Sequence, residues 1–214
     1  MSKRLFAFVL IFSMAIALTA GCAKKPAQVT GDVATDQTLR YNLGVAEPET
    51  LDPHLQSGVS EFNVASQMYE GLTRMDANNT PIPGVAEKWD PSADGKSYTF
   101  HLRKNAKWTN GDPVTAKDFE WSWKRALDPR TGSGYAYQLY YIKGGTALNT
   151  ADAKDEAKIK ALTDALGVKA KGDYTLEVTL EAPTPYFLGL TSFPTLYPLH
   201  QAEVIKLGDK WAAE

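Results

Sequence analysis

The pattern of apolar and polar residues begins with a long uncharged run at the N-terminus. Residues 5–20 contain no charged side chain, and Lys3 and Arg4 precede them. Small residues follow and lead into Cys22, the only cysteine of the chain. A basic start, an apolar run and a small-residue cleavage site are typical of a secretory signal peptide. An uncut membrane anchor is the alternative, but the run is shorter than the roughly 20 residues that a spanning helix needs.

Alternating apolar and polar residues predict several short strands in the rest of the chain. The first is expected over residues 38–46, and a second over 72–75, followed by an extended proline-containing connector over 81–84. Two hairpins are expected, one pairing residues 86–90 with 97–103 and the other pairing 167–171 with 174–181. In residues 97–103 every second side chain is aromatic or aliphatic, as in a half-buried strand.

Apolar residues at helical spacing predict helices between these strands. They are expected over residues 60–72, 115–127, 136–148, 152–162, 186–190 and 200–207. Thr115 and Asp118 have the spacing of a capping box, and Asp128 with Pro129 ends the same helix. Phe119, Trp123 and Trp108 are expected in the core. Mixed helices and antiparallel hairpins indicate an α+β chain.

The residues around the cysteine resemble the lipobox of bacterial lipoproteins. Residues 18–21 (LTAG) precede Cys22 directly. The resemblance implies that residues 1–21 are a lipoprotein signal peptide and that Cys22 carries the lipid that anchors the protein to the membrane. Two or more acyl chains give stable anchoring, whereas one is marginal. Residues 22–37 have no apolar periodicity and are expected to form a flexible tether.

Composition and charge exclude several functions. Loss of Lys3 and Arg4 leaves 21 basic against 25 acidic side chains, interspersed along the chain, so nucleic acid is not expected as a partner. The three histidines, His54, His101 and His200, are scattered, and neither a metal site nor a cofactor is expected. A hydrolase is the other class considered, but the common nucleophile, phosphate-loop and zinc motifs are missing. Glu47, Glu49 and Asp52 are interpreted as solvated loop carboxylates.

Three blocks of sequence resemble a known family. Residues 84–89 (GVAEKW), 98–103 (YTFHLR) and 108–119 (WTNGDPVTAKDF) are similar to the signature region of the peptide-binding proteins of ABC importers, the oligopeptide/dipeptide/nickel-type solute-binding family. Further matches are residues 51–54 (LDPH), 70–72 (EGL), 123–129 (WKRALDP) and 176–180 (LEVTL). The resemblance spans about residues 38–211 and is strongest to the oligopeptide-binding branch.

The resemblance implies a periplasmic-binding-protein-like fold of type II, with two lobes around a cleft and an extra inserted domain. Residues 38–71 would open the first lobe, 72–190 would form the extra α+β domain, and 191–214 would return to the first lobe. Family members are considerably longer, so the chain is expected to be truncated, with the second lobe absent. Residues 23–214 alone are then expected to bind peptides weakly at best.

The resemblance also implies the ligand, the partners and the site. A short extended peptide would be captured between the lobes by strand addition and delivered to an ABC permease and ATPase complex. No bond of the peptide would be broken. Val59 and Ser57 match the loop whose backbone meets the peptide, and Tyr135 matches a tyrosine of the cleft, although a surface-loop tyrosine is the alternative. Ser57 stands where glutamate is usual, and Phe193 where histidine can occur.

Other ligands and roles stay open within the same family. A nickel chelate, haem or a sugar could replace the peptide, and a peptide-sensing receptor could use the same fold for signalling. In each case the protein is expected to be a monomeric, extracytoplasmic, lipid-anchored binding protein of a bacterium. Peptide length, sequence preference and the number of membranes of the host do not follow from the sequence.

Overall fold

A computed structural model describes residues 38, 40–44 and 47–212. The chain divides into two units, Met1–Asn42 and Leu43–Glu214, and every helix and strand named below belongs to the second. The predicted signal peptide, Cys22 and the predicted tether lie outside the described residues. No helix in the described part of the chain combines the length and apolarity that crossing a bilayer requires.

An antiparallel sheet of four strands forms the centre of the second unit. Its order is β3 (Ala86–Pro91), β4 (Ser97–Leu102), β6 (Thr175–Thr179) and β5 (Val168–Ala170). Phe100 pairs with Trp89 on one side and with Leu176 on the other. The register of β3 shifts by one residue between Ala86 and Lys88. Both hairpins predicted from the alternating pattern are confirmed.

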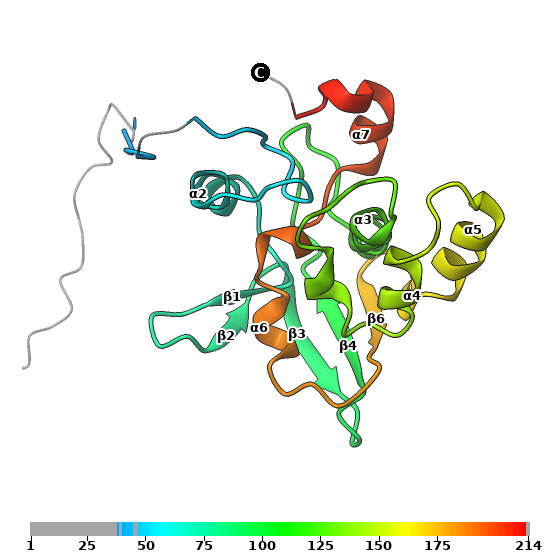
Figure 1. The fold of residues 1–214 in the computed structure, drawn as a ribbon. Coiled ribbons are helices and arrows are strands. Elements are labelled where there is room, and N and C mark those ends of the chain that lie inside the picture. The colour runs from blue at the N-terminus through cyan, green and yellow to red at the C-terminus, as the bar shows by residue number, and fades with distance from the viewer. Residues whose placement is uncertain (1–37, 39, 45–46, 213–214) are drawn as a thin grey trace, which may run out of the picture. The chain divides into compact units, whose positions relative to one another are not determined.

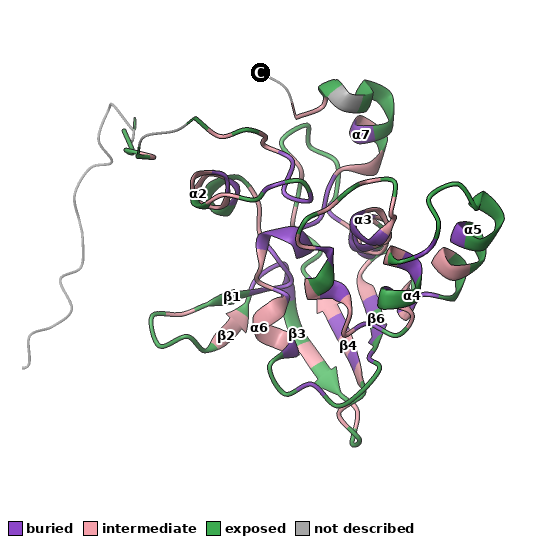
Figure 2. Ribbon diagram, viewed as in Figure 1, coloured by how far each residue is buried: buried purple, intermediate pink, exposed green. Residues whose placement is uncertain are grey.

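One helix, α3 (Ala116–Leu127), packs on this sheet and completes the core (Figures 1 and 2). Every second residue of β4 is buried, as the pattern predicts. Phe119 and Trp123 of α3 are fully buried, which confirms their predicted place in the core. The α3 N-terminus is capped by Asp118, whose carboxylate accepts a hydrogen bond of 2.7 Å from Thr115 N.

Short helices surround this layer. They are α2 (Val59–Met68), η1 (Ala136–Leu139), α4 (Gly145–Asn149), α5 (Glu156–Ala165), α6 (Phe187–Leu190), η2 (Pro194–Leu196), α7 (Gln201–Leu207) and η3 (Gly208–Lys210). The predicted helix over residues 60–72 is shorter than expected, since α2 ends at Met68 and β1 (Thr73–Met75) follows. The helix expected over residues 152–162 begins later, at Glu156, where Asp155 caps it.

The helix predicted over residues 136–148 is wrong, because two glycines divide it into η1 and α4. Gly144 has φ of +83°, a left-handed conformation that favours glycine. A Cβ on Gly145 would lie 2.6 Å from Leu139 O, so the chain passes close to itself here. Apolar spacing alone could not place this break, although the Gly-Gly pair is visible in the sequence.

Two predictions about strands also need correction. The connector over residues 81–84 contains a strand, β2 (Pro81–Pro83), in which Ile82 pairs with Arg74 of β1. Proline is tolerated here because the sheet has only these two strands, so that β2 has a free edge. The strand predicted over residues 38–46 is not found at the described positions of that range, 38 and 40–44. Alternation marks a possible face but does not specify a partner strand.

Candidate functional site

Four aromatic side chains from three separate segments form one patch. The aromatic patch consists of Phe62 on α2, Tyr135 and Tyr137 at η1, and Phe193 before η2. The ring centroid of Phe62 lies 5.3 Å from that of Tyr135 and 5.2 Å from that of Phe193. Tyr135 and Phe193 are 5.6 Å apart, and Tyr137 lies 5.7 Å from Tyr135. The structure therefore brings together two of the predicted site residues.

The other two predicted site residues lie at the start of α2. Ser57 is exposed, and the Val59 side chain is 75% exposed. Between them Gly58 is the N-cap of the helix, where an added Cβ would lie 2.2 Å from Glu61 Oε2. The Glu61 carboxylate accepts a hydrogen bond of 3.0 Å from Glu49 N, and this bond is the main cause that lowers its pKa. Glu61 thus fixes the loop that carries Ser57 and Val59.

A buried ion pair ties the same loop to α3. Asp52, which is 2% exposed, accepts two hydrogen bonds from Arg125, of 2.7 and 3.2 Å. Asp52 also accepts from His54 N at 2.9 Å, which closes a turn. The interpretation of Asp52 as a solvated loop carboxylate is wrong, because the long Arg125 side chain reaches it from α3. Because Arg125 is 73 positions away from Asp52, no local pattern in the sequence indicates that the two residues pair.

His54 completes this cluster as a neutral imidazole. Its Nδ1 accepts a hydrogen bond of 2.9 Å from Arg125, and its Nε2 lies 3.4 Å from Tyr197 O, to which it donates. Burial is the main cause that lowers its pKa, with Arg125 adding to the effect and Asp52 opposing it, to about 4. The ring therefore connects the loop to the Tyr197 segment without bearing charge at neutral pH.

Helix α3 also positions the segment that carries Phe193. Trp123 Nε1 donates a hydrogen bond of 2.8 Å to Leu196 O, and Ser122 Oγ accepts one of 2.7 Å from Leu199 N. In Figure 1 the orange segment containing η2 passes just below α2, and the two elements are in contact. The aromatic patch is thus held by a buried framework on α3.

Three side chains next to the patch have buried polar atoms that make no hydrogen bond within the part of the chain that the structure describes. They are Gln56, Ser133 and Thr195, each within two residues of a predicted site residue. Buried polar groups are nearly always satisfied by protein or by ordered water. These atoms lie in the three segments that carry the predicted site residues.

A separate hollow lies elsewhere on the unit, with a volume of about 750 Å³. It is lined by the end of α2, by β1 and by Trp108 and Tyr197, and it includes no residue of the aromatic patch. Trp108 was expected in the core but is only partly buried, with its ring 5.5 Å from that of His200. Its indole N–H has no hydrogen-bond partner among the described residues.

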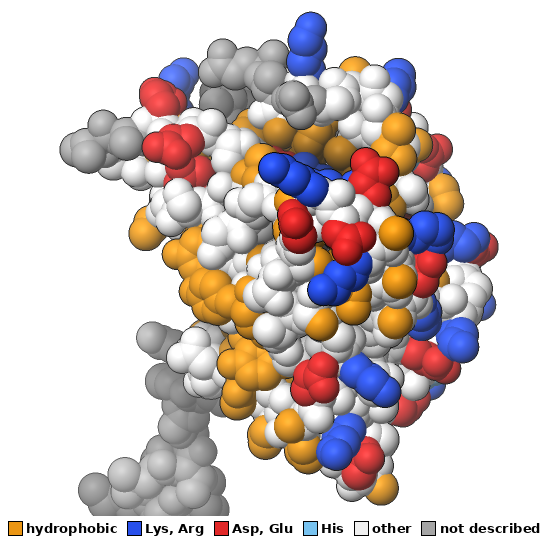
Figure 3. Space-filling view, turned by 45° about the vertical axis from the view of Figure 1, so that its right-hand side comes forward, with side chains coloured by type: hydrophobic (Ala, Val, Ile, Leu, Met, Phe, Trp, Pro, Cys, Tyr) orange, Lys and Arg blue, Asp and Glu red, His pale blue; other side chains and the backbone are white. Residues whose placement is uncertain are grey.

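Charges of both signs are mixed on one face of the molecule, and the described residues offer no cluster of metal ligands. On the face that Figure 3 shows, Lys and Arg alternate with Asp and Glu. Residues 38, 40–44 and 47–212 contain no group of three or more His, Cys, Asp or Glu placed to hold a metal ion. The aromatic patch therefore offers binding by packing rather than by coordination.

The fold is shared with a known class of binding proteins. A family profile described as bacterial extracellular solute-binding proteins, family 5 Middle, matches residues 80–213. The chain therefore belongs to the bacterial extracellular solute-binding proteins, family 5. The predicted periplasmic-binding-protein-like fold is confirmed over the share of these proteins that the chain covers.

Individual relatives agree with this assignment. The chain is 49% identical over 191 residues to the periplasmic oligopeptide-binding protein OppA of Escherichia coli, covering 88% of this chain and 33% of the relative. It is 47% identical to the oligopeptide-binding protein OppA of Bacillus subtilis, covering 81% and 30%. The structure of Haemophilus influenzae OppA in complex with RPPGFSPFR matches with a TM-score of 0.70 and 44% identity, covering 80% and 32%. The chain spans about a third of the length of these relatives.

Two parts of this site do not follow from the sequence. Phe62 is one of several apolar residues at helical spacing, and nothing in the pattern sets it apart as a neighbour of the predicted site residues. The Asp52–Arg125 pair joins two motifs, residues 51–54 and 123–129, that stand out only for their resemblance. The presence of both motifs in one chain is the only hint that they touch.

Proposed function

We propose that this chain is part of an extracytoplasmic binding protein, lipid-anchored through Cys22, that captures short peptides and delivers them to an ABC permease and ATPase complex for uptake. The observation that carries the proposal is the aromatic patch beside the exposed Ser57–Val59 loop. It occurs in a chain that resembles a peptide-bound structure at 44% identity.

The physical basis of capture is strand addition. An extended peptide satisfies its backbone groups by hydrogen bonds to an exposed loop, whatever its side chains are, and aromatic surface packs against those side chains. Val59 is the backbone contact, with Ser57, Tyr135 and Phe193 around it. The peptide is released unchanged, so the protein is not an enzyme, and it works as a monomer. Residues 38–71 and 191–214 belong to the first lobe, and 72–190 to the extra domain.

Native mass spectrometry on the complete protein, purified from its own membranes, tests the ligand. Release of short peptides on unfolding supports the proposal. Release of haem, a metal chelate or a sugar overturns it and keeps only the family. Uptake of a labelled tripeptide by cells with and without the gene then separates import from sensing, because a sensing receptor leaves uptake unchanged.

A further inference from the structure

We propose that the aromatic patch selects peptides with an apolar or aromatic side chain and rejects an acidic one at the same position. This inference rests on the proposed function, since it names the peptide chemistry that the same site takes. It assigns Phe62, which lies in none of the sequence motifs, as a specificity-determining residue.

The rings of the patch are arranged to accept a further ring. Phe62, Tyr135 and Phe193 have pairwise centroid distances of 5.2 to 5.6 Å, with rings tilted or edge-on to one another. Such an arrangement presents ring edges and faces together, and another aromatic side chain packs on it in the same way. All three rings are partly buried, so they are fixed by packing yet not closed off, and the neighbouring Tyr137 is 50% exposed.

The segments that carry the patch hold almost no charge. Among residues 57–62, 133–137 and 192–195, Glu61 is the single charged residue. Glu61 is only 4% exposed, and its carboxylate is used by Glu49 N and by Ser60, so it holds the loop. A peptide carboxylate placed against the rings would meet their negative faces and lose water without gaining a partner, which is costly.

The neighbouring framework keeps the rings in place and keeps its own charges occupied. Asp52, His54 and Arg125 bind one another and leave no charge directed to the patch among these three residues. The buried α3 contacts to Leu196 and Leu199 hold Phe193 in place from behind. The patch is therefore a preformed apolar surface, and selectivity needs no rearrangement of charged groups.

The test uses the complete mature protein, freed of co-purified peptide, in isothermal titration calorimetry. The ligands are trialanine and trialanine carrying one Phe or Glu at each position in turn. At one position Phe is expected to bind roughly ten-fold more tightly than Glu, the scale of an aromatic contact together with an avoided charge burial. Trialanine itself provides the baseline that depends only on the peptide backbone.

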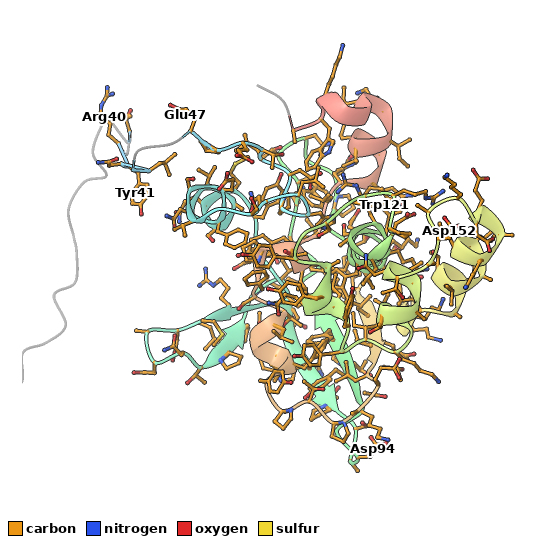
Figure 4. The ribbon with its side chains drawn as sticks, viewed as in Figure 1. Arg40, Tyr41, Glu47, Asp94, Trp121 and Asp152 are labelled. Atoms are coloured by element: carbon orange, nitrogen blue, oxygen red, sulfur yellow. The ribbon has the colours of Figure 1, made fainter. Side chains whose placement is uncertain are left out.

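The variants are Phe62→Leu and Phe193→Leu, which keep apolar volume and remove a ring. Each is expected to weaken the Phe peptide by about 3- to 10-fold more than it weakens trialanine, so that the preference for Phe falls. Trp121→Leu is the matched control, because Trp121 lies on the α5 side of α3 (Figure 4), where it lines a different hollow. Thermal unfolding of each variant confirms that it is folded.

The outcomes separate the two proposals. If no peptide binds the wild-type protein, the proposed function fails. If all peptides bind alike, or if Phe62→Leu weakens trialanine as much as the Phe peptide, peptide binding stands and the aromatic selectivity is overturned. If the Glu peptide is preferred at every position, another part of the complete protein covers the patch and the inference is also overturned.

Discussion

At the scale of single residues, burial decides the properties of the loop that carries Ser57 and Val59. Asp52, His54 and Arg125 are polar or charged, and each would be expected on a surface by its residue type. Their mutual hydrogen bonds make burial tolerable, since a buried charge needs a partner. For these three residues, residue type predicts exposure, whereas tertiary contacts bury them. The burial of Phe119 and Trp123 is predictable, because helical spacing and apolar residue type both indicate it.

The buried His54 predicts a pH dependence of stability. Its pKa is about 4 in the folded protein against 6.5 in the unfolded chain. Between these values only the unfolded chain binds the proton, so stability is full above pH 6.5 and falls as the pH drops to 4. The loss is on the order of 3 kcal/mol. Urea unfolding at pH 7 and pH 4.5 measures it, and His54→Gln should remove this part of the slope. If the unfolding free energy depended on pH equally in the wild-type protein and in His54→Gln, the low pKa of His54 would be contradicted.

The buried Asp52–Arg125 pair predicts that removing the charge of Asp52 strongly lowers the stability of the protein. Asp52→Asn leaves the Arg125 guanidinium, whose side chain is 19% exposed, without its carboxylate partner. The free energy of unfolding should fall by about 3 kcal/mol, as for other broken buried pairs. Asp90→Asn is the control, because Asp90 pairs with His101 at the surface and such pairs are worth about 1 kcal/mol or less. Chemical denaturation at pH 7 compares them, and similar losses would rule out a special role for the buried pair.

At the scale of elements, the sequence pattern is most reliable where pairing and packing are local. The hairpins β3–β4 and β5–β6 join neighbours in the sequence, and α3 carries both a capping acid and a continuous apolar face. Figure 4 shows Asp94 at the tip of the β3–β4 hairpin, where it accepts hydrogen bonds from Ser92 and Lys96. Predictions fail where the chain changes direction, as at residues 136–148, or needs a distant partner, as at residues 38–46.

The break between η1 and α4 predicts a contrast between two glycines. Gly144→Ala forces a side chain into φ of +83° and should lower the free energy of unfolding by about 1 kcal/mol. Gly189→Ala, in α6, meets only Met75 Cε at 4.0 Å and should leave stability unchanged or slightly raised. Thermal unfolding followed by circular dichroism gives both values. Equal effects would show that the backbone conformation of Gly144 is not the cause of the break.

At the scale of the whole molecule, the fold and the aromatic patch belong to a chain that matches only part of the length of each relative. The relatives are about three times as long as the share that this chain covers. Short blocks of sequence are enough to identify the family because those blocks build the β4 strand and the start of α3. The side-chain preference that we propose cannot be predicted in the same way, since it depends on rings from three segments that only the fold brings together.

If Cys22 carries the anchor, as we propose, its substitution separates two interpretations of the N-terminus. Membrane attachment through a diacylglycerol and an acylated amino terminus needs the thiol, whereas an uncut apolar helix does not. Cys22→Ser should therefore lose the lipid mass and leave the membrane fraction, while the wild-type protein stays there after a carbonate wash. Intact mass spectrometry of the wild type should begin at residue 22 with the lipid attached. A Cys22→Ser protein that remains in the membrane at unchanged length would instead establish residues 5–20 as the anchor.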